Sequence, residues 1–139
     1  MHEDAKIPQR AHGTDYGYDV TAVSVEKVGF LTYKYHLGFA IEPVRDKQRF
    51  GNLCVRIAPR SSVWKTGMVL SNCEGIIDES YRGEVCAVYY HVLPWKKKYK
   101  AGDRVGQMFI ATAPKMTFIE ADTLSVTERA DGGYGSSGR

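Results

Sequence analysis

An acid and an aromatic ring stand three residues apart in the stretch from Glu74 to Glu84. The apolar pair Ile76 and Ile77 leads into the carboxylate of Asp78, a turn-prone Glu-Ser step follows, and Tyr81 comes next. A polar turn between two strands is typical of a β-hairpin, so the pattern predicts an acid and a ring at its tip. By spacing alone a structural turn is the commoner explanation. Asp78 becomes a catalytic candidate only through other parts of the chain.

Two further stretches offer donors for an anion. In Pro59-Arg60-Ser61-Ser62, a guanidinium and two hydroxyls precede a short helix expected through Lys65, and amides at a helix start attract phosphate. In 102–107, a turn enters a strand that carries Arg104 and Gln107. Each stretch alone also has a structural explanation, as a helix cap or as a turn with a surface ion pair.

The chain ends in a segment with little apolar surface. Residues 128–139 contain four glycines, the ring of Tyr134, the hydroxyls of Ser136 and Ser137, and two arginines. Such a tail is ordinarily frayed. Its glycines let backbone approach an anion, so the composition also suits a mobile lid over a nucleotide triphosphate.

Length and composition narrow the class of protein. The 139 residues are enough for one domain, and 43% hydrophobic with 25% charged residues argue against disorder and against a membrane protein. No apolar run approaches the ~18 residues of a spanning helix, and the first twelve residues do not resemble a secretory signal. We therefore expect an intracellular, cytoplasmic protein without a membrane partner, although the sequence does not separate cytoplasm from nucleus.

Nucleic-acid binding and protein-bound zinc have little support in the sequence. The net charge is only +3, and the basic run Lys96 to Lys100, which contains Tyr99, is better explained as a solvated turn than as a nucleic-acid contact. The three cysteines and four histidines show no paired metal-ligand spacing. Free, largely buried thiols are the simplest expectation.

Period-two hydrophobic patterns recur, whereas a helical period over ten residues does not. Short strands separated by Gly, Pro and Asp indicate an all-β domain of the jelly-roll or β-clip type, with at most one short helix and a flexible glycine-rich tail. The expected strands are 18–23, 31–37, 53–58, 67–70, 85–92, 104–111 and 116–120.

Five stretches in order resemble the five sequence motifs of the trimeric deoxyuridine triphosphate nucleotidohydrolases, the dUTPases. Together they span residues 17 to 138 with order and spacing kept, which makes the match far more specific than any one motif. The stretches are Gly17-Tyr18-Asp19-Val20, Pro59-Arg60-Ser61-Ser62, 75–83, 102–107, and Arg129 with Gly132-Gly133-Tyr134-Gly135-Ser136-Ser137-Gly138.

The resemblance implies hydrolysis of dUTP to dUMP and pyrophosphate, in a homotrimer whose active sites are shared between chains. It implies a β domain over 1–128 with a flexible C-terminal lid over 129–139. Magnesium would be held mainly by triphosphate oxygens and water, without a direct protein ligand and with Asp19 in the outer shell at most.

The resemblance also implies residue roles. Asp78 would activate the water that attacks the α-phosphorus, and Tyr81 would lie under the deoxyribose and exclude a 2′-hydroxyl. The uracil edge would be read by Asn72, Gly75, Ile76, Ile77 and Cys86, while the phosphates and the closing tail would engage Arg60, Ser61, Ser62, Gln107, Arg129, Tyr134, Gly135, Ser136 and Ser137.

Some residues depart from the family pattern, and two alternatives remain at this point. Tyr134 replaces a more usual phenylalanine, Gly106 stands where alanine is common, and the charged segment Pro43 to Asn52 has no explanation. A dCTP deaminase of the same architecture is the nearest rival enzyme, although an Asp-x-x-Tyr arrangement suits a hydrolase better. A nucleotide-controlled regulatory binding protein is the alternative from another class.

Overall fold

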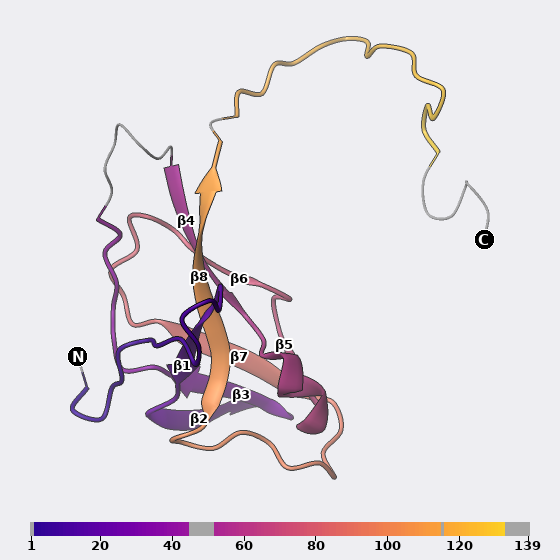
Figure 1. Ribbon diagram of the computed structural model, residues 1–139. Coiled ribbons are helices and arrows are strands. Elements are labelled where there is room, and N and C mark those ends of the chain that lie inside the picture. Colours follow the sequence, from indigo (N-terminus) through magenta and orange to yellow (C-terminus); the bar gives the residue numbers. More distant parts are fainter. Residues whose placement is uncertain (1, 45–51, 115, 133–139) are drawn as a thin grey trace.

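The structure is a computed structural model that describes residues 2–44, 52–114 and 116–132. In these ranges the chain forms eight strands and one short 3-10 helix (Figure 1). They are β1 (Tyr18–Thr21), β2 (Ser24–Gly29), β3 (Thr32–His36), β4 (Asn52–Ala58), η1 (Ser61–Lys65), β5 (Met68–Leu70), β6 (Gly75–Ile77), β7 (Cys86–His91) and β8 (Arg104–Ala113). The predicted all-β class with at most one short helix is confirmed.

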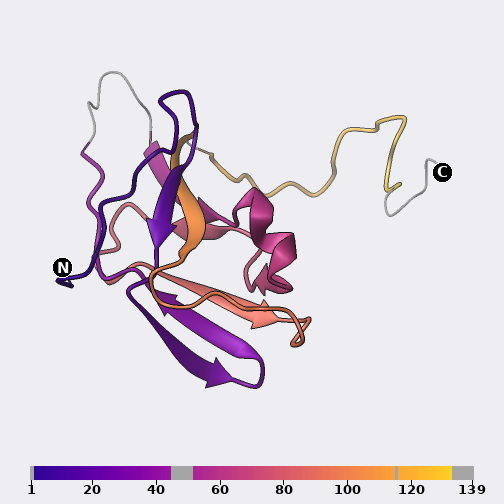
Figure 2. The same cartoon turned by 60° about the horizontal axis from the view of Figure 1, so that its bottom comes forward.

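The strands form two antiparallel four-stranded sheets. One sheet has the order β1-β8-β4-β6, and the other has the order β2-β3-β7-β5. Figures 1 and 2 show the two sheets as the layers of a small sandwich, in the manner of a jelly roll. Apart from β2 and β3, neighbours in each sheet are distant in sequence, so the motifs are brought together by strand pairing rather than by local turns.

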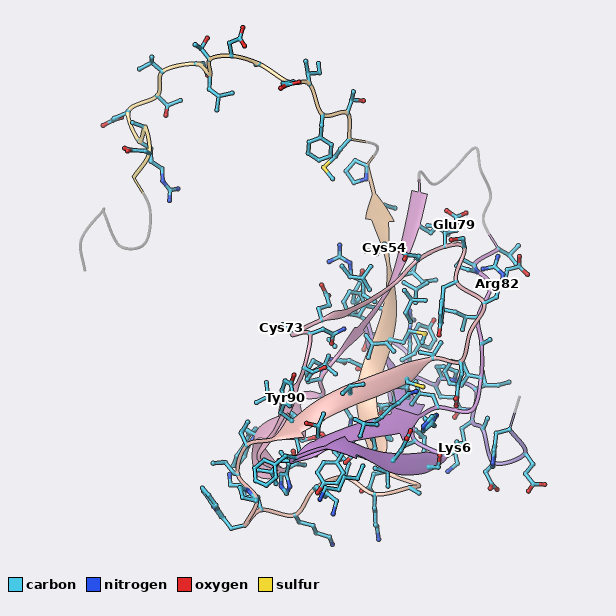
Figure 3. All side chains as sticks on the ribbon, turned by 180° about the vertical axis from the view of Figure 1, so that it is seen from behind. Lys6, Cys54, Cys73, Glu79, Arg82 and Tyr90 are labelled. Atoms are coloured by element: carbon cyan, nitrogen blue, oxygen red, sulfur yellow. The ribbon has the colours of Figure 1, made fainter. Side chains whose placement is uncertain are left out.

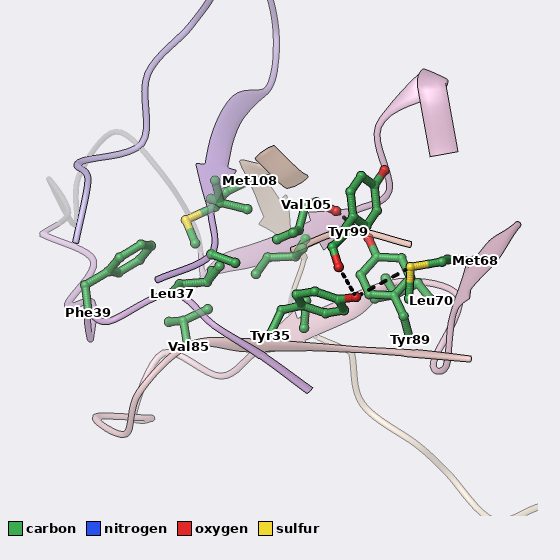
Figure 4. Packing of buried hydrophobic residues seen from close by; sticks show 14 of the residues in the cluster. Tyr35, Leu37, Phe39, Met68, Leu70, Val85, Tyr89, Tyr99, Val105 and Met108 are labelled. Atoms are coloured by element: carbon green, nitrogen blue, oxygen red, sulfur yellow. Dashed lines mark hydrogen bonds between the residues drawn. The ribbon is translucent and has the colours of Figure 1, made fainter. Parts of the chain in front are cut away.

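The core lies between the sheets because alternate residues of each strand point inward. In β7, Ala87 and Tyr89 are buried, while the intervening Val88 is partly exposed and Tyr90 is exposed. This confirms the alternation predicted from sequence. Figure 4 shows most of the packed side chains of the buried cluster, whose members are Val20, Ala22, Tyr35, Leu37, Phe39, Val55, Ile57, Met68, Leu70, Val85, Ala87, Tyr89, Tyr99, Val105 and Met108.

Three tyrosines occupy the centre of this core. The rings of Tyr35, Tyr89 and Tyr99 meet edge to face, with centroids 5.8 to 6.1 Å apart. The Tyr35 hydroxyl donates to the Tyr99 carbonyl at 3.0 Å, and the Tyr89 hydroxyl donates to the Val105 carbonyl at 2.6 Å. Burial raises the pKa of both hydroxyls, so they remain protonated donors.

The predicted hairpin around Asp78 is wrong. Strand β6 pairs with β4, whereas β7 pairs with β3 and β5 in the other sheet. The chain between Ile77 and Cys86 is therefore a crossover between the two layers. A polar turn between two strands predicts a reversal of direction, but the partner of each strand is decided by burial and by distant segments.

Other local predictions also fail. The expected strand at 116–120 has no partner in the described chain. Strand β2 was missed because all six of its residues are exposed, so its sequence has no alternation of buried and exposed positions. The thiols are not largely buried, because Cys73 is exposed and Cys54 and Cys86 are partly exposed.

After β8 the chain leaves the sandwich, and its described residues from 116 to 132 form no helix or strand (Figures 1 and 3). Phe118, Ile119, Leu124 and Val126 are each at least 85% exposed in this segment. Apolar side chains in such number normally contact another surface. None of the described helices is long and apolar enough to cross a bilayer.

The tyrosine cluster predicts a specific cost for losing one buried hydroxyl. Tyr89→Phe removes the donor to Val105 and should lower the free energy of unfolding by about 1–2 kcal/mol. The neighbouring Tyr90→Phe is the control, because its ring is half exposed (Figure 3), and it should change stability by less than about 0.5 kcal/mol. Urea titration of both variants makes the comparison, and equal midpoints contradict it.

Candidate active site

Strand β6 and the crossover after it line a cavity of about 270 Å³, called here the β6 cavity. The predicted base- and sugar-binding residues Asn72, Gly75, Ile76, Ile77, Tyr81 and Cys86 line it, together with the predicted catalytic residue Asp78. Lys34, Ile57, Glu84 and Val85 complete its wall. The carboxylate of Asp78, the ring of Tyr81 and the backbone of β6 therefore share one space.

Asp78 and Tyr81 are held together by a tight turn. The Tyr81 amide donates to the Asp78 carbonyl at 3.0 Å, and the Tyr81 hydroxyl donates to the Glu84 carbonyl at 3.1 Å. A Cβ on Gly83 would overlap the Tyr81 ring, so a glycine is required where the ring folds over the backbone. The ring and the carboxylate are thus oriented by the crossover itself.

A second row of candidate residues meets across the larger strands. Gln107 of β8 faces Asp19 of β1 on one side and Ala58 of β4 on the other. Because Arg60 follows β4 directly, this register brings three sequence motifs to one end of the sheet. Gln107 Nε2 donates to the Pro59 carbonyl at 3.3 Å.

These residues line a cavity of about 370 Å³, called here the Arg60 cavity, whose wall contains Ala11, Asp15, Tyr16, Gly17, Asp19, Arg60, Ser61, Gln107 and Phe109. A side chain at position 17 would lie 2.7 Å from Gln107 Oε1, so glycine allows the Gln107 side chain to approach. The carboxylate of Asp19 accepts from Arg60 Nε at 2.9 Å and from Arg104 Nη1 at 2.7 Å. Asp19 therefore positions two guanidinium groups.

Ser61 and Ser62 lie in η1 and do not cap it. Arg60 is the N-cap residue, and no side chain makes a capping hydrogen bond. This corrects the predicted serine cap. Ser61 faces the Arg60 cavity, whereas Ser62 lines a neighbouring basic cavity of about 470 Å³ together with Arg60 and several lysines. The serine hydroxyls are left available for other partners.

The two cavities share no lining residue, and they lie towards opposite edges of the sheet, where β6 and β1 are the edge strands. Ile77 pairs with Val55 in the antiparallel β4–β6 ladder. Asp78 is the next residue after Ile77, so its position along β4 corresponds to that of Cys54. From there to Arg60 the chain advances roughly six residue steps of about 3.3 Å, or roughly 20 Å. Neither side chain is long enough to close that gap within one chain.

A polar cluster adjoins the β6 cavity. His36 lies opposite Cys86 in the β3–β7 ladder, and its Nδ1 is 2.8 Å from Glu84 Oε2. The hydrogen bond with His36, together with the Gly38 amide, holds the pKa of the Glu84 carboxyl below its usual value. Burial raises the pKa of the Cys86 thiol.

Some predicted residues are not brought together. Arg129 is exposed on the C-terminal segment, where its Nε donates to the Gly132 carbonyl at 2.9 Å, and it lines neither cavity. Tyr134, Gly135, Ser136 and Ser137 lie outside the described residues, as does most of the charged segment 43–52.

Sequence reasoning missed several cavity residues. Lys34 reaches the β6 cavity from β3, and only the long-range β3–β7 register places it there. Glu84 could have been predicted from its spacing, because it precedes Cys86 by two residues. In an extended chain, residues two apart lie on the same face. Tyr16 and Phe109 meet through their rings at 5.4 Å and had no signal before β1 and β8 were paired.

The dUTPase family model matches residues 3–138 of this chain. A deoxyuridine 5'-triphosphate nucleotidohydrolase of Alkaliphilus metalliredigens is 35% identical over 96% of this chain and 90% of its own length. The protein of that name from Arabidopsis thaliana is 32% identical over 99% of this chain and 80% of its length. The chain belongs to the dUTPase family.

Solved structures agree on the fold. A mutant dUTPase of Staphylococcus bacteriophage 80alpha with dUpNHpp has a TM-score of 0.78 at 21% identity, covering 99% of this chain and 95% of its own. A mutant dUTPase from phage phi11 of S. aureus, described with a structural Mg(II) ion, has a TM-score of 0.70 at 18% identity, covering 90% and 95%. The sandwich of this chain is thus the fold of those dUTPases.

The two ion pairs of Asp19 predict a measurable stability effect. Asp19→Ala leaves Arg60 and Arg104 without their shared acceptor and should lower the free energy of unfolding by about 1–2 kcal/mol. This estimate is at the low end for charged hydrogen bonds because both arginines are partly exposed. Asp4→Ala, at a side chain that is 77% exposed, should stay within about 0.5 kcal/mol. Equal chemical denaturation curves for the two variants contradict the role of Asp19.

Proposed function

We propose that this protein hydrolyses dUTP to dUMP and pyrophosphate. The observation that carries the proposal is the β6 cavity, where Asp78, Tyr81 and the backbone of β6 surround one space of about 270 Å³. Membership of the dUTPase family and the names of the relatives support the same substrate. The relatives' names favour a hydrolase over a deaminase.

Asp78 is proposed as the general base for the attacking water. Attack on a phosphoanhydride requires a water placed in line with the α-phosphorus and an acceptor for its proton. Asp78 is exposed to the cavity and lies on the same turn as Tyr81, whose ring is fixed through Glu84. A sugar packed on that ring would bring the α-phosphate toward the carboxylate.

Recognition of uracil is assigned to Asn72 and the backbone of Gly75, Ile76, Ile77 and Cys86. Backbone amides and carbonyls at the edge of β6 offer donors and acceptors in a fixed arrangement, which distinguishes uracil from cytosine by leaving groups unpaired with the wrong base. A strand edge against the ring also leaves little room for the methyl group of thymine. The Tyr81 ring would occupy the space that a 2′-hydroxyl needs.

The phosphates are assigned to Arg60, Ser61, Ser62 and Gln107. Cationic and neutral donors in one row neutralise the charge that spreads over the phosphoryl oxygens in the transition state. Arg60 is oriented for this by its ion pair with Asp19 at 2.9 Å. The bond between Gln107 and the Pro59 carbonyl keeps this row together.

The residues fit magnesium bound through the substrate and not through a set of protein ligands. Asp19 is occupied by two arginines, so it suits an outer-shell contact through water. The phi11 relative is described with a structural magnesium ion, and that description concerns that protein. When bound to the triphosphate, magnesium neutralises negative charge and favours departure of pyrophosphate. The residues of this chain would bind the phosphates and accept the proton of the attacking water.

We further propose a homotrimer in which each active site combines the β6 cavity of one chain with the Arg60 cavity of another. The separation of roughly 20 Å along β4 supports this arrangement. The exposed Phe118, Ile119 and Leu124 support it too, because an apolar segment that leaves its own sandwich suits contact with a second chain.

The C-terminal residues are proposed as a lid over the bound nucleotide. Arg129, Ser136 and Ser137 would meet the terminal phosphates, with Tyr134 stacked on uracil and Gly135 allowing close approach. The exposed Arg129, remote from both cavities of its own chain, is consistent with delivery to a neighbouring site. A nucleotide-handling enzyme of this kind is expected in the cytoplasm.

The direct test is pyrophosphate release from dUTP, UTP, dCTP and dTTP with magnesium present. The proposal predicts release from dUTP at a kcat/KM far above that of the other three. Ammonia release from dCTP would replace the hydrolase with a deaminase. Tight binding of dUTP without turnover would favour a nucleotide-controlled regulator.

Asp78→Asn should retain dUTP binding and lower kcat by about 10²–10⁴-fold, because the amide cannot take the proton of the attacking water. Asp4→Asn, on an exposed side chain outside the β6 and Arg60 cavities, serves as the control and should keep wild-type turnover. Single-turnover kinetics separates chemistry from binding. An unchanged chemical step in the Asp78 variant removes that residue from its proposed role.

Tyr81→Ala should reduce the preference for dUTP over UTP, because the space for a 2′-hydroxyl opens. Tyr81→Phe is the matched variant, since it keeps the ring and loses only the bond to the Glu84 carbonyl. It should keep most of the discrimination. The ratio of kcat/KM for the two nucleotides is the measurement, and an unaltered ratio in the alanine variant refutes the steric role.

A further inference from the structure

One cluster beside the β6 cavity offers nitrogen, oxygen and sulfur ligands together, and two of its members, Glu84 and Cys86, line the cavity. His36 Nδ1, a Glu84 carboxylate oxygen and Cys86 Sγ lie within 4.8 Å of one another, and within the described residues this is the one group of three such ligands. His36 and Cys86 are a cross-strand pair, and Glu84 precedes Cys86 by two residues. The β3–β7 ladder therefore holds His36 and Cys86 side by side, and the chain just before β7 brings Glu84 to within hydrogen-bond distance of His36.

The ligand atoms are spaced for a small cation. A tetrahedral zinc site, with bonds of about 2.0–2.3 Å, needs ligand atoms roughly 3.3–3.8 Å apart. His36 Nδ1 and Cys86 Sγ are 3.6 Å apart, which already meets that requirement. His36 Nδ1 and Glu84 Oε2 are 2.8 Å apart, so their hydrogen bond would have to open by roughly 0.5 Å.

The surroundings already contain the supporting contacts of a metal site. A histidine that binds metal through one ring nitrogen usually donates its other N–H to a carboxylate. His36 Nε2 lies 3.4 Å from Glu26 Oε2, on the side of the ring away from Glu84 and Cys86. The second oxygen of Glu84 accepts from the Gly38 amide at 2.9 Å, which orients the carboxylate.

The charges around the cluster match a dication. Glu26 and Glu84 supply two carboxylates, and a deprotonated Cys86 adds a thiolate. Lys34 is the basic residue on the same cavity wall and interacts with Cys86. Three negative charges and one positive charge give a net charge of two negative units, which one divalent cation neutralises. Coordination would send the thiol proton to solvent.

We propose that His36, Glu84 and Cys86 form a binding site for a thiophilic divalent cation of the zinc class. Three protein ligands leave a fourth position for water, as in open zinc sites. Because Glu84 and Cys86 line the β6 cavity, a cation there occupies part of the space assigned to uracil. Cation and nucleotide are therefore antagonists, a consequence that rests on the proposed function.

Cobalt(II) replaces zinc as the probe, because a cobalt–thiolate bond gives a charge-transfer band in the near ultraviolet. Wild-type protein without nucleotide should show this band and saturate at one cobalt per chain, and zinc should displace the cobalt. Cys86→Ser should lose the band, and Glu26→Gln should weaken cobalt binding about tenfold or more. Cys73→Ser, at an exposed thiol outside the cluster, should bind as wild type.

A wild-type protein without the band, or a band that survives Cys86→Ser, overturns the site. Loss of the band in Cys73→Ser also overturns the site. His36→Gln provides a second variant if Cys86→Ser is poorly folded, and retention of full affinity there also counts against the site.

The antagonism is tested with dUMP. Saturating dUMP should weaken cobalt binding at least tenfold, and an unchanged cobalt affinity overturns the antagonism. The binding of dUMP without metal is measured separately, so failure of the proposed function is distinguished from failure of the cation site.

Discussion

The pairing order β1-β8-β4-β6 is the constraint on which the rest of the structure depends. Strand β4 pairs with β8 on one side and β6 on the other, so it carries both halves of the chemistry. Arg60 follows the C-terminal end of β4. Asp78 directly follows Ile77, the β6 residue that pairs with Val55. An antiparallel ladder fixes this separation, because slipping by one residue would turn every inward side chain outward.

Each half is built by residues that perform no chemistry. Gly83 leaves room for the Tyr81 ring, and Gly17 leaves room for Gln107. Asp19 holds two guanidinium groups, so its carboxylate orients donors. The hydrogen bond from Tyr89 of β7 to the Val105 carbonyl of β8 joins the two layers. The crossover that carries Asp78 leads directly into β7, so packing between the sheets supports one end of that crossover.

Much of the fold followed from alternation, as the burial of Ala87 and Tyr89 shows. The hairpin around Asp78 failed because a polar turn is a local signal, whereas the partners of β6 and β7 are set by distant strands. Strand β2 was not predicted, because a fully exposed strand has no alternation of buried and exposed residues.

The candidate site was also predicted only in part. Gly75, Ile76, Ile77, Asp78 and Tyr81 were predicted together from one stretch of sequence and line one cavity. Lys34 was not predicted, because it reaches that cavity through the long-range register of β3 with β7. The separation of Asp78 from Arg60 along β4 could not be predicted from local patterns, and only the family resemblance implied active sites shared between chains.

Shared active sites are the central claim, and a mixed oligomer tests them most directly. Asp78→Asn and Arg60→Ala are each expected to be nearly inactive alone. Unfolded together in equal amounts and refolded, they should regain about a quarter of wild-type dUTP turnover, because that fraction of sites would draw both intact residues from different chains. Activity no greater than the average of the two separate variants would show that one chain supplies both residues.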